Sequence, residues 1–428
     1  MKTKYMNIRN NKLYIGDYSL EKIAEEYKTP LYVYDEKHLR DELDNYVNNF
    51  KSKKFETSIV YATKAFLVPE LCHILNEKQY HLDIVSKGDM DVLEKANFPF
   101  NNVVFHGNNK SYEELCHAVD KNIGLIVVDN IRELEILEEI ACSKGKVIDT
   151  LFRFNPGIDA HTHKYIKTAL YESKFGESIY DEKKIEQIIV TYKNSPHVNF
   201  LGCHSHIGSQ IREHKPFLLN INKMLEFTKS LNDKYNLDLS VIDLGGGMGI
   251  DYESEESGFK IEELLLKMIQ RLESKIKKLN LNIKKVLIEP GRSIVGTSGV
   301  TLYKCGYLKT TFTGKNYLFI DGGMTDNIRP ALYQAVYDVD IVNRMNDEKT
   351  LKADIVGKCC ESGDIIARDA MIPNVKENDI MVVYNTGAYT YSMSSNYNGL
   401  YKPAVIFVSD KIKIVSKRET EKEINKLF

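Results

Sequence analysis

Tryptophan is absent from the sequence, and so are long apolar runs and blocks of charge of one sign. The formal net charge is -2 with no basic cluster, which argues against nucleic acid or an anionic membrane as a partner. No apolar stretch stands at the N-terminus, and none elsewhere is long enough to cross a bilayer. We therefore expect neither a signal peptide nor a transmembrane helix.

Cysteine is scarce and irregularly spaced. The seven cysteines include no CxxC pair, and two of them, Cys359 and Cys360, are adjacent. An odd number without paired spacing excludes a disulfide framework and does not match a zinc site. This usage is typical of a protein in a reducing cytoplasm, where we expect this one. The dinucleotide signature GxGxxG and the P-loop ending GK[ST] are missing too.

The 428 residues exceed the size of one ordinary core, which predicts two domains. From residue 58 to residue 290, short apolar strands alternate with amphipathic helices, among them 214–235 and 261–280. This alternation predicts an α/β fold with a parallel sheet, and eight strands over this span fit a (β/α)8 TIM-type barrel. The expected strands are SIVYAT, LDIVS, VVFHG, LIVVD, TLFRF, FLGCHSH, SVIDL and VLIEP.

After about residue 300 the pattern changes to β-rich segments separated by turn residues, such as NYLFID, DIMVVYN and AVIFVSD. We predict a barrel domain over residues 36–298. Residues 1–35 and 299–428 are predicted to form a second, β-rich domain with a barrel-like or sandwich-like sheet.

Uncommon polar residues stand where the predicted barrel strands end, which is where barrel enzymes place their catalytic groups. These residues are Lys64, Ser86, His106, Arg153, His206, Gly245 to Gly247, Glu289 and Arg292. Lys64 is either a lysine that extends into solvent or an amine that forms a Schiff base with an aldehyde. The strand count favours the second interpretation, because it places Lys64 at a common mouth with the others.

Three further motifs have two interpretations each. The run Gly245-Gly246-Gly247 is either a tight turn or a cradle of N–H groups for a phosphate. Glu289 and Arg292 form a structural ion pair, or they bind a charged ring nitrogen and an anion. In His204-Ser205-His206, His204 is interpreted as a core residue and His206 as a ring that stacks on a flat cofactor. A metal site using His106, His161 and His163 is the weaker alternative, so we expect no metal.

Taken together, the motifs resemble those of the fold-type III pyridoxal-phosphate decarboxylases over nearly the whole chain. The matching stretches are VYATKA, HGNNKS, ESKFG, CHSHIGSQ, DLGGGMG, EPGRSIVG, DGGMTDNIRPALY, CESGD and GAYTYSMSSNYNG. The resemblance implies pyridoxal 5'-phosphate as the cofactor and an amino acid as the substrate. It also implies a homodimer whose active sites are shared between subunits. Lys358 stands where a proline is common in the family.

The resemblance assigns roles to individual residues. Lys64 bonds to the cofactor, Glu289 pairs with its ring nitrogen, and His206 stacks on the ring. The remaining cofactor contacts are Ser209, Gly245, Gly246, Gly247, Gly291, Arg292 and Tyr389. The substrate contacts are Arg292, Arg329, Tyr333, Glu361 and Tyr389. Cys360 is the proton donor, and it comes with Glu361 from the partner subunit.

Within the family, CESGD favours meso-2,6-diaminopimelate as substrate, with L-lysine and carbon dioxide as products. The alternative substrates are ornithine, arginine, lysine and carboxynorspermidine, whose decarboxylases usually carry an aspartate after the cysteine. A non-catalytic relative that regulates a partner is expected to have lost Lys64 or Cys360, and both are present. A metal-dependent barrel hydrolase ranks last among the hypotheses.

Overall fold

The computed structural model describes residues 2–159, 173–252 and 257–428. The chain divides into two compact units. The barrel unit comprises Leu43–Gly249 and Gly258–Gly291, and the β-rich unit comprises Met1–Glu42, Ile250–Ser257 and Arg292–Phe428. These bounds differ from the expected 36–298 at both ends, and the barrel domain is interrupted by 250–257. That segment belongs to the β-rich unit because Asn385 Nδ2 donates to Asp251 O at 3.0 Å and the Tyr252 ring packs edge-on against Tyr337.

The barrel unit contains a closed ring of eight parallel strands, with β13 paired back to β5. The eight predicted strands and the predicted (β/α)8 barrel are thus confirmed. The strands are β5 (Glu56–Ala62), β6 (His81–Ile84), β7 (Val103–Phe105), β8 (Leu125–Val128), β9 (Ile148–Asn155), β11 (Val198–His204), β12 (Val241–Asp243) and β13 (Lys285–Ile288). A two-residue strand, β10 (Glu177–Ser178), pairs in parallel with the last residues of β9.

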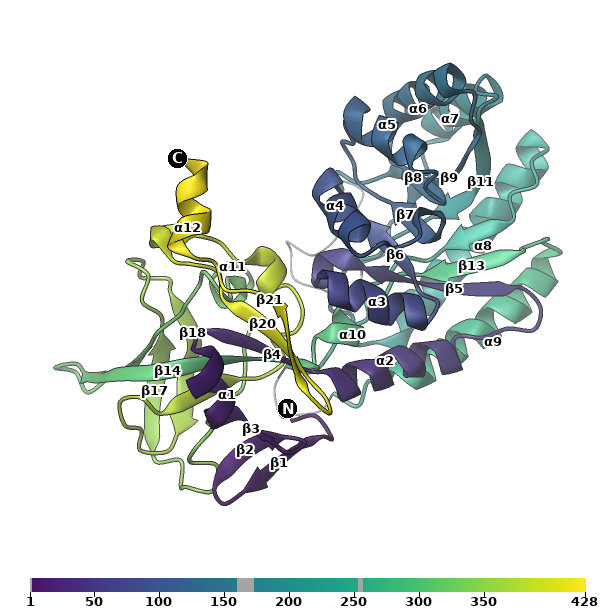
Figure 1. Cartoon of the computed structure of the whole chain (residues 1–428). Coiled ribbons are helices and arrows are strands. Elements are labelled where there is room, and N and C mark those ends of the chain that lie inside the picture. The colour runs from purple at the N-terminus through teal and green to yellow at the C-terminus, as the bar shows by residue number, and fades with distance from the viewer. Residues whose placement is uncertain (1, 160–172, 253–256) are drawn as a thin grey trace. The chain divides into compact units, whose positions relative to one another are not determined.

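Helices follow the barrel strands and lie outside the ring (Figure 1). They are α3 (Pro69–Glu77), α4 (Lys87–Lys95), α5 (Tyr112–Asp120), α6 (Ile131–Lys144), α7 (Glu182–Lys193), α8 (His214–Tyr235) and α9 (Ile261–Leu279), and α2 (Glu36–Asn49) precedes β5. Their sequences explain their ends: Ser111 and Glu114 form a reciprocal capping box on α5, and Gly145 closes α6 in the left-handed conformation.

Several barrel strands each contribute one or two apolar side chains to a shared buried cluster, as expected for a barrel of this type. The cluster consists of Val60, Val104, Leu125, Val127, Leu151 and Leu287. Because apolar side chains fill the ring, the polar residues of the strands are left to the ends.

The β-rich unit has a large sheet in the order β18-β17-β15-β14-β4-β20-β21, with β19 joining β14 to β16. A small antiparallel sheet, β1-β2-β3, packs on it through one hydrophobic cluster. The strands are β1 (Met6–Arg9), β2 (Lys12–Ile15), β3 (Tyr18–Ser19), β4 (Leu31–Asp35), β14 (Gly299–Thr310), β15 (Asn316–Ile320), β16 (Val339–Ile341), β17 (Leu351–Val356), β18 (Ile365–Ile372), β19 (Ile380–Val383), β20 (Ala404–Val408) and β21 (Ile412–Ser416).

The helices of the β-rich unit are short: α1 (Leu20–Tyr27), α10 (Arg292–Val295), α11 (Arg329–Tyr333) and α12 (Glu421–Ile424). Strand β4 pairs with both β14 and β20, so segments from the two ends of the chain share one sheet. In the part of the chain that the structure describes, no helix has the length and apolar character needed to cross a membrane.

Candidate active site

Lys64 lies in a single 3-10 turn, Thr63–Ala65, directly after β5. Its Nζ donates to Oδ2 of Asp83 at 2.7 Å, and Thr63 Oγ1 donates to Asp83 O at 2.6 Å. The side chain of Asp83 is 1% exposed, whereas that of Lys64 is 44% exposed. A buried carboxylate on the neighbouring strand therefore fixes an amine that still reaches solvent.

Glu289 is the centre of a buried cluster at the end of β13. One carboxylate oxygen faces His204 Nε2 at 3.3 Å, and the other lies 2.5 Å from His106 Nε2. Burial opposes ionisation, but the two facing rings outweigh it and hold the pKa of Glu289 well below its usual range. Burial also lowers the pKa of His204 to about 3, so the neutral ring donates its N–H to the carboxylate.

Asp243, at the end of β12, joins this cluster with the opposite ionisation. Burial and the neighbouring charge of Glu289 raise the pKa of Asp243 well above its usual value, while the hydrogen bond from Gly245 N at 2.9 Å opposes the shift. The pKa values of two neighbouring buried carboxyls thus shift in opposite directions. Glu289 favours the ionised form, and Asp243 favours the protonated form. Such a separation is common in sites that hold a proton at one place.

His106, His204, Asp243 and Glu289 bring their donor atoms within 4.8 Å of one another, which is the composition of a metal site. His204 and His106 both face the Glu289 carboxylate, at 3.3 Å and 2.5 Å. We interpret the cluster as the surroundings of that buried carboxylate. His161 and His163, weighed as further ligands, lie outside the described residues.

His206 and the run Gly245 to Gly247 form a further part of the strand-end region, next to the Glu289 cluster in the sequence of the strands. Gly246 N donates to His206 Nδ1 at 3.3 Å, which leaves the ring proton on Nε2, and burial lowers the pKa of His206 well below its usual value. Gly245 and Gly247 have φ of 65° and 106°. A Cβ on Gly245 would lie 2.5 Å from Ser205 O, so the run packs against the segment of His206 and Ser209 as only glycine can. A Cβ on Gly291 would lie 2.9 Å from Ala62 Cβ, so this glycine is confined as well.

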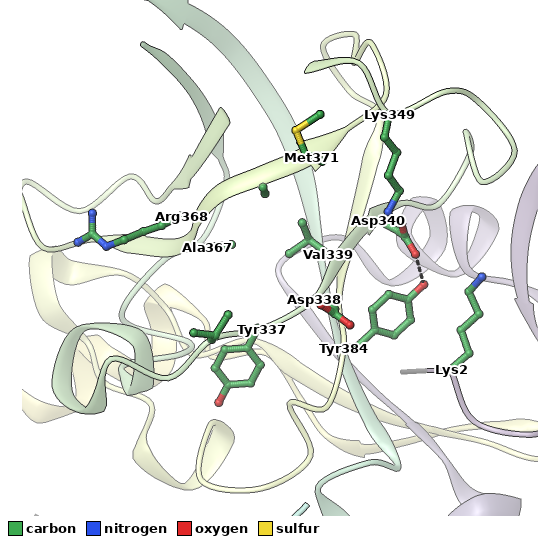
Figure 2. Close-up of a pocket in the computed structure, with 12 residues that line it drawn as sticks. Lys2, Tyr337, Asp338, Val339, Asp340, Lys349, Ala367, Arg368, Met371 and Tyr384 are labelled. Atoms are coloured by element: carbon green, nitrogen blue, oxygen red, sulfur yellow. Dashed lines mark hydrogen bonds and ion pairs between the residues drawn. The ribbon is translucent and has the colours of Figure 1, made fainter. Parts of the chain in front are cut away.

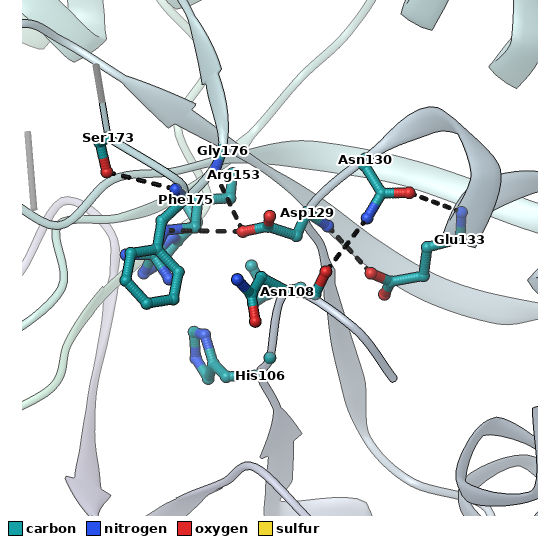
Figure 3. Close-up of polar contacts among 12 residues, drawn as sticks. His106, Asn108, Asp129, Asn130, Glu133, Arg153, Ser173, Phe175 and Gly176 are labelled. Carbon is teal, nitrogen blue, oxygen red and sulfur yellow. Dashed lines mark hydrogen bonds and ion pairs between the residues drawn. The ribbon is translucent and has the colours of Figure 1, made fainter. Parts of the chain in front are cut away.

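A second polar cluster lies at the ends of β8 and β9 (Figure 3). The guanidinium of Arg153 lies 4.0 Å from Asp129 and 4.6 Å from the Phe175 ring. Asp129 Oδ1 also accepts from Gly176 N at 3.1 Å. Burial lowers the pKa of Arg153, and nearby Asp129 and Glu289 oppose the shift. These contacts place a cation among the strand ends.

In the β-rich unit, two buried arginines share an aromatic cluster. Arg292 Nη1 donates to Tyr252 Oη at 2.5 Å, and Arg329 Nε donates to Tyr337 Oη at 2.9 Å. Both guanidinium carbons lie within 6 Å of the Tyr252 and Tyr389 rings, and that of Arg329 is 5.2 Å from the Tyr333 ring. Two guanidinium groups within one aromatic cluster suit a ligand with negative charge.

Cys360 and Glu361 are both exposed in the single chain. Cys360 N donates to Asn398 Oδ1 at 2.7 Å, which ties the cysteine loop to the segment before β20. The adjacent Cys359 is buried, and burial raises the pKa of its thiol to about 11. Of the two adjacent thiols, Cys360 is therefore the one open to a reacting group.

A cavity of 550 Å³ in the β-rich unit contains none of the expected site residues (Figure 2). Among the charged residues that line it, Asp340 accepts from Lys349 at 2.6 Å and from Tyr384 Oη at 3.0 Å. We do not assign it a role in the chemistry.

The sequence did not predict the contacts that four residues of these clusters make. Asp83 carried a signal, a charge inside the apolar strand LDIVS. His106 was expected at a strand end and weighed as a metal ligand, but not as a neighbour of Glu289, and His204 was interpreted as a core residue. Tyr252 gave no signal, because its segment was assigned to the barrel rather than to the β-rich unit.

Comparisons with known proteins identify the family of this chain. Residues 37–296 match the family described as "Pyridoxal-dependent decarboxylase, pyridoxal binding domain". The chain belongs to this family, the fold-type III pyridoxal-dependent decarboxylases.

Within the family, the chain is similar to diaminopimelate decarboxylases over nearly its whole length. It is 41% identical to the enzyme of Bacillus subtilis, with 97% of this chain and 94% of that protein covered. The crystal structure of the M. jannaschii diaminopimelate decarboxylase superposes with a TM-score of 0.91 at 30% identity, covering 98% and 96% of the two chains. That of Helicobacter pylori, complexed with L-lysine, gives 0.86 at 33% identity over 95% and 98%.

The residues present fit pyridoxal phosphate. Oε1 of Glu289 is buried, and His106 Nε2 lies 2.5 Å from it. An ionised oxygen in this state suits a protonated ring nitrogen. Lys64 offers an amine to the aldehyde, and the glycine run suits a phosphate.

Proposed function

We propose that this protein decarboxylates meso-2,6-diaminopimelate to L-lysine and carbon dioxide. Its main support is one arrangement: within a single closed barrel, Asp83 holds the amine of Lys64, and an ionised, buried Glu289 lies on the adjacent strand. The similarity to diaminopimelate decarboxylases over 97% of the chain supports the choice of substrate.

Bound pyridoxal phosphate supplies an aldehyde for amines and a sink for the electrons that remain when carbon dioxide leaves. Lys64 Nζ would hold the aldehyde carbon, and Asp83 directs that amine. Glu289 would keep a proton on the ring nitrogen, because its own pKa lies well below its usual range. The neutral His206 ring presents an apolar face for stacking.

The remaining roles are divided between the two units. In the barrel unit, Gly245 to Gly247, Gly291 and Ser209 would hold the phosphate. In the β-rich unit, Arg292 and Tyr389 would contribute to cofactor binding, and Arg329 with Tyr333 would bind a substrate carboxylate. Glu361 suits the distal ammonium of the substrate. Cys360, with an exposed thiol, would donate the proton to the carbon that loses carbon dioxide.

A decarboxylation assay over a panel of amino acids tests this function. With added pyridoxal phosphate, we expect release of carbon dioxide from meso-2,6-diaminopimelate and formation of L-lysine. Ornithine, arginine, lysine and carboxynorspermidine should turn over at least about a hundredfold more slowly. A site that binds the second carboxylate of diaminopimelate through Arg329 leaves this arginine without a partner when the substrate lacks that carboxylate. Turnover of ornithine without turnover of diaminopimelate would refute the proposal, and cofactor binding with no turnover at all would indicate a regulatory relative.

We also propose a cytoplasmic homodimer in which Cys360 and Glu361 complete the partner's site. Their exposure in the single chain supports this arrangement, and seven free thiols suit a reducing compartment. Mixing two inactive variants, Lys64→Ala and Cys360→Ala, under conditions that allow subunit exchange should restore about a quarter of wild-type activity. Half of the dimers are then mixed, and each holds one intact site. Activity that stays at the level of the separate variants would show that each chain supplies its own cysteine.

A further inference from the structure

Asp364, the last residue of CESGD, is a buried carboxyl that joins two distant segments of the β-rich unit. It is 3% exposed. Its Oδ1 accepts from Met324 N at 2.6 Å, and its Oδ2 accepts from Cys359 N at 2.8 Å. One carboxylate thus fixes the backbone immediately before Cys360 and the backbone of the DGGMTDN motif.

Two glycines make room for this carboxylate. A Cβ on either Gly323 or Gly357 would overlap the carboxylate oxygens of Asp364. Neither glycine has a positive φ, so backbone conformation does not require glycine at these positions. The space that the Asp364 carboxylate occupies therefore explains why positions 323 and 357 are both glycine.

The joined segments carry residues that we have assigned to the reaction. On one side, Cys359 is followed by Cys360 and Glu361. On the other, Met324 leads to Asn327, whose Oδ1 accepts from Arg329 N at 3.3 Å at the start of α11. Lys358 N donates to Gly322 O at 3.0 Å, which adds a link that the proline common at this position cannot make.

We propose that Asp364 is a positioning residue that fixes the Cys360 loop against the segment leading into Arg329. This proposal rests on the proposed roles of Cys360 and Arg329. A carboxylate is required because two N–H groups point at one side chain, and each of its oxygens accepts one of them. An amide at position 364 has one acceptor oxygen and turns an NH2 group toward the other N–H.

Two variants test the role of Asp364, one by changing its carboxylate and one by filling the space that the carboxylate occupies. Asp364→Asn keeps the shape and removes one acceptor, and Gly323→Ala keeps Asp364 but fills the space of its carboxylate. The matched control is Gly363→Ala in the same loop, where an added Cβ comes no closer than 3.9 Å to Glu361 Oε1. If Asp364→Asn fails to fold, Gly323→Ala decides the question.

The first measurement is amide hydrogen exchange of the holoenzyme at Met324 and Cys359. Exchange should be at least about tenfold faster at one of the two amides in Asp364→Asn, which keeps a single acceptor, and at both amides in Gly323→Ala, which displaces the carboxylate, whereas the control should match wild type. Exchange within about twofold of wild type in both variants overturns the proposal.

The second measurement separates positioning from general stability. Below the melting temperature of each variant, kcat for decarboxylation should fall and KM should rise, each by about tenfold, with the absorbance of bound cofactor unchanged. Faster exchange with wild-type kcat and KM makes Asp364 merely structural and overturns the proposal. If wild-type enzyme decarboxylates no diamino acid, the proposed function fails, and the exchange result alone decides whether Asp364 holds the loop.

Discussion

Replacing Lys64 by alanine is expected to lower kcat for decarboxylation by at least about 10³-fold and to abolish the absorbance of the covalently bound cofactor. The amine is the one group at the end of β5 that can bond to the aldehyde, and Asp83 holds it in place at 2.7 Å. Absorbance spectra of the purified variant with added pyridoxal phosphate, and a carbon dioxide release assay, measure both effects.

The matched control is Lys87→Ala. Lys87 also stands just after a barrel strand, but its side chain is 55% exposed and pairs with Asp91 one helical turn away. An exposed pair of this kind contributes little, so activity and absorbance should stay near wild type. A Lys64→Ala variant with wild-type absorbance would refute the covalent role of Lys64.

Replacing Glu289 by glutamine is expected to lower kcat by about 10²- to 10⁴-fold, the range typical of a residue that controls a proton at the reacting group. Glutamine keeps the shape of the side chain but carries no charge, so nothing then favours a protonated ring nitrogen. Steady-state kinetics at saturating cofactor measure the loss, and a melting curve checks that the barrel is folded.

Asp243→Asn is the comparison that isolates charge. Asp243 is equally buried and belongs to the same cluster, but its raised pKa favours the protonated, uncharged form. An amide should therefore resemble it closely, and the loss of kcat should be at least about tenfold smaller than for Glu289→Gln. Equal losses in the two variants would mean that packing, not the ionised carboxylate, limits the rate.

Much of the barrel could be predicted from the sequence because its strands are short apolar runs followed by uncommon polar residues. Lys64 and Glu289 were found this way, since strand ends of a parallel ring converge. The partners of these residues were harder to predict. Whether Asp83 bonds to Lys64 depends on which strands are neighbours, and His204 faces Glu289 across a register that one strand does not reveal.

In the β-rich unit the sequence was less informative. Its sheet combines β4 from one end of the chain with β14 and β20 from the other. No local sequence pattern predicts which of these strands pair. Tyr252 and Asp364 were missed for the same reason: each acts on residues that are remote in the chain. Motif resemblance located Arg292, Arg329 and Cys360, and their assigned roles stay predictions until the variants are measured.

The closure of the barrel between its first and last strands has a consequence for the folding of the newly synthesised chain. Lys64 follows β5 and Glu289 follows β13, so the two ends of the cofactor's ring system would be held by residues more than two hundred positions apart. Contacts this remote in sequence form late and slowly. A nascent chain released before β13 cannot assemble the site. The absorbance of bound cofactor therefore reports completed folding, and it should appear in refolding experiments only after most of the secondary structure has formed.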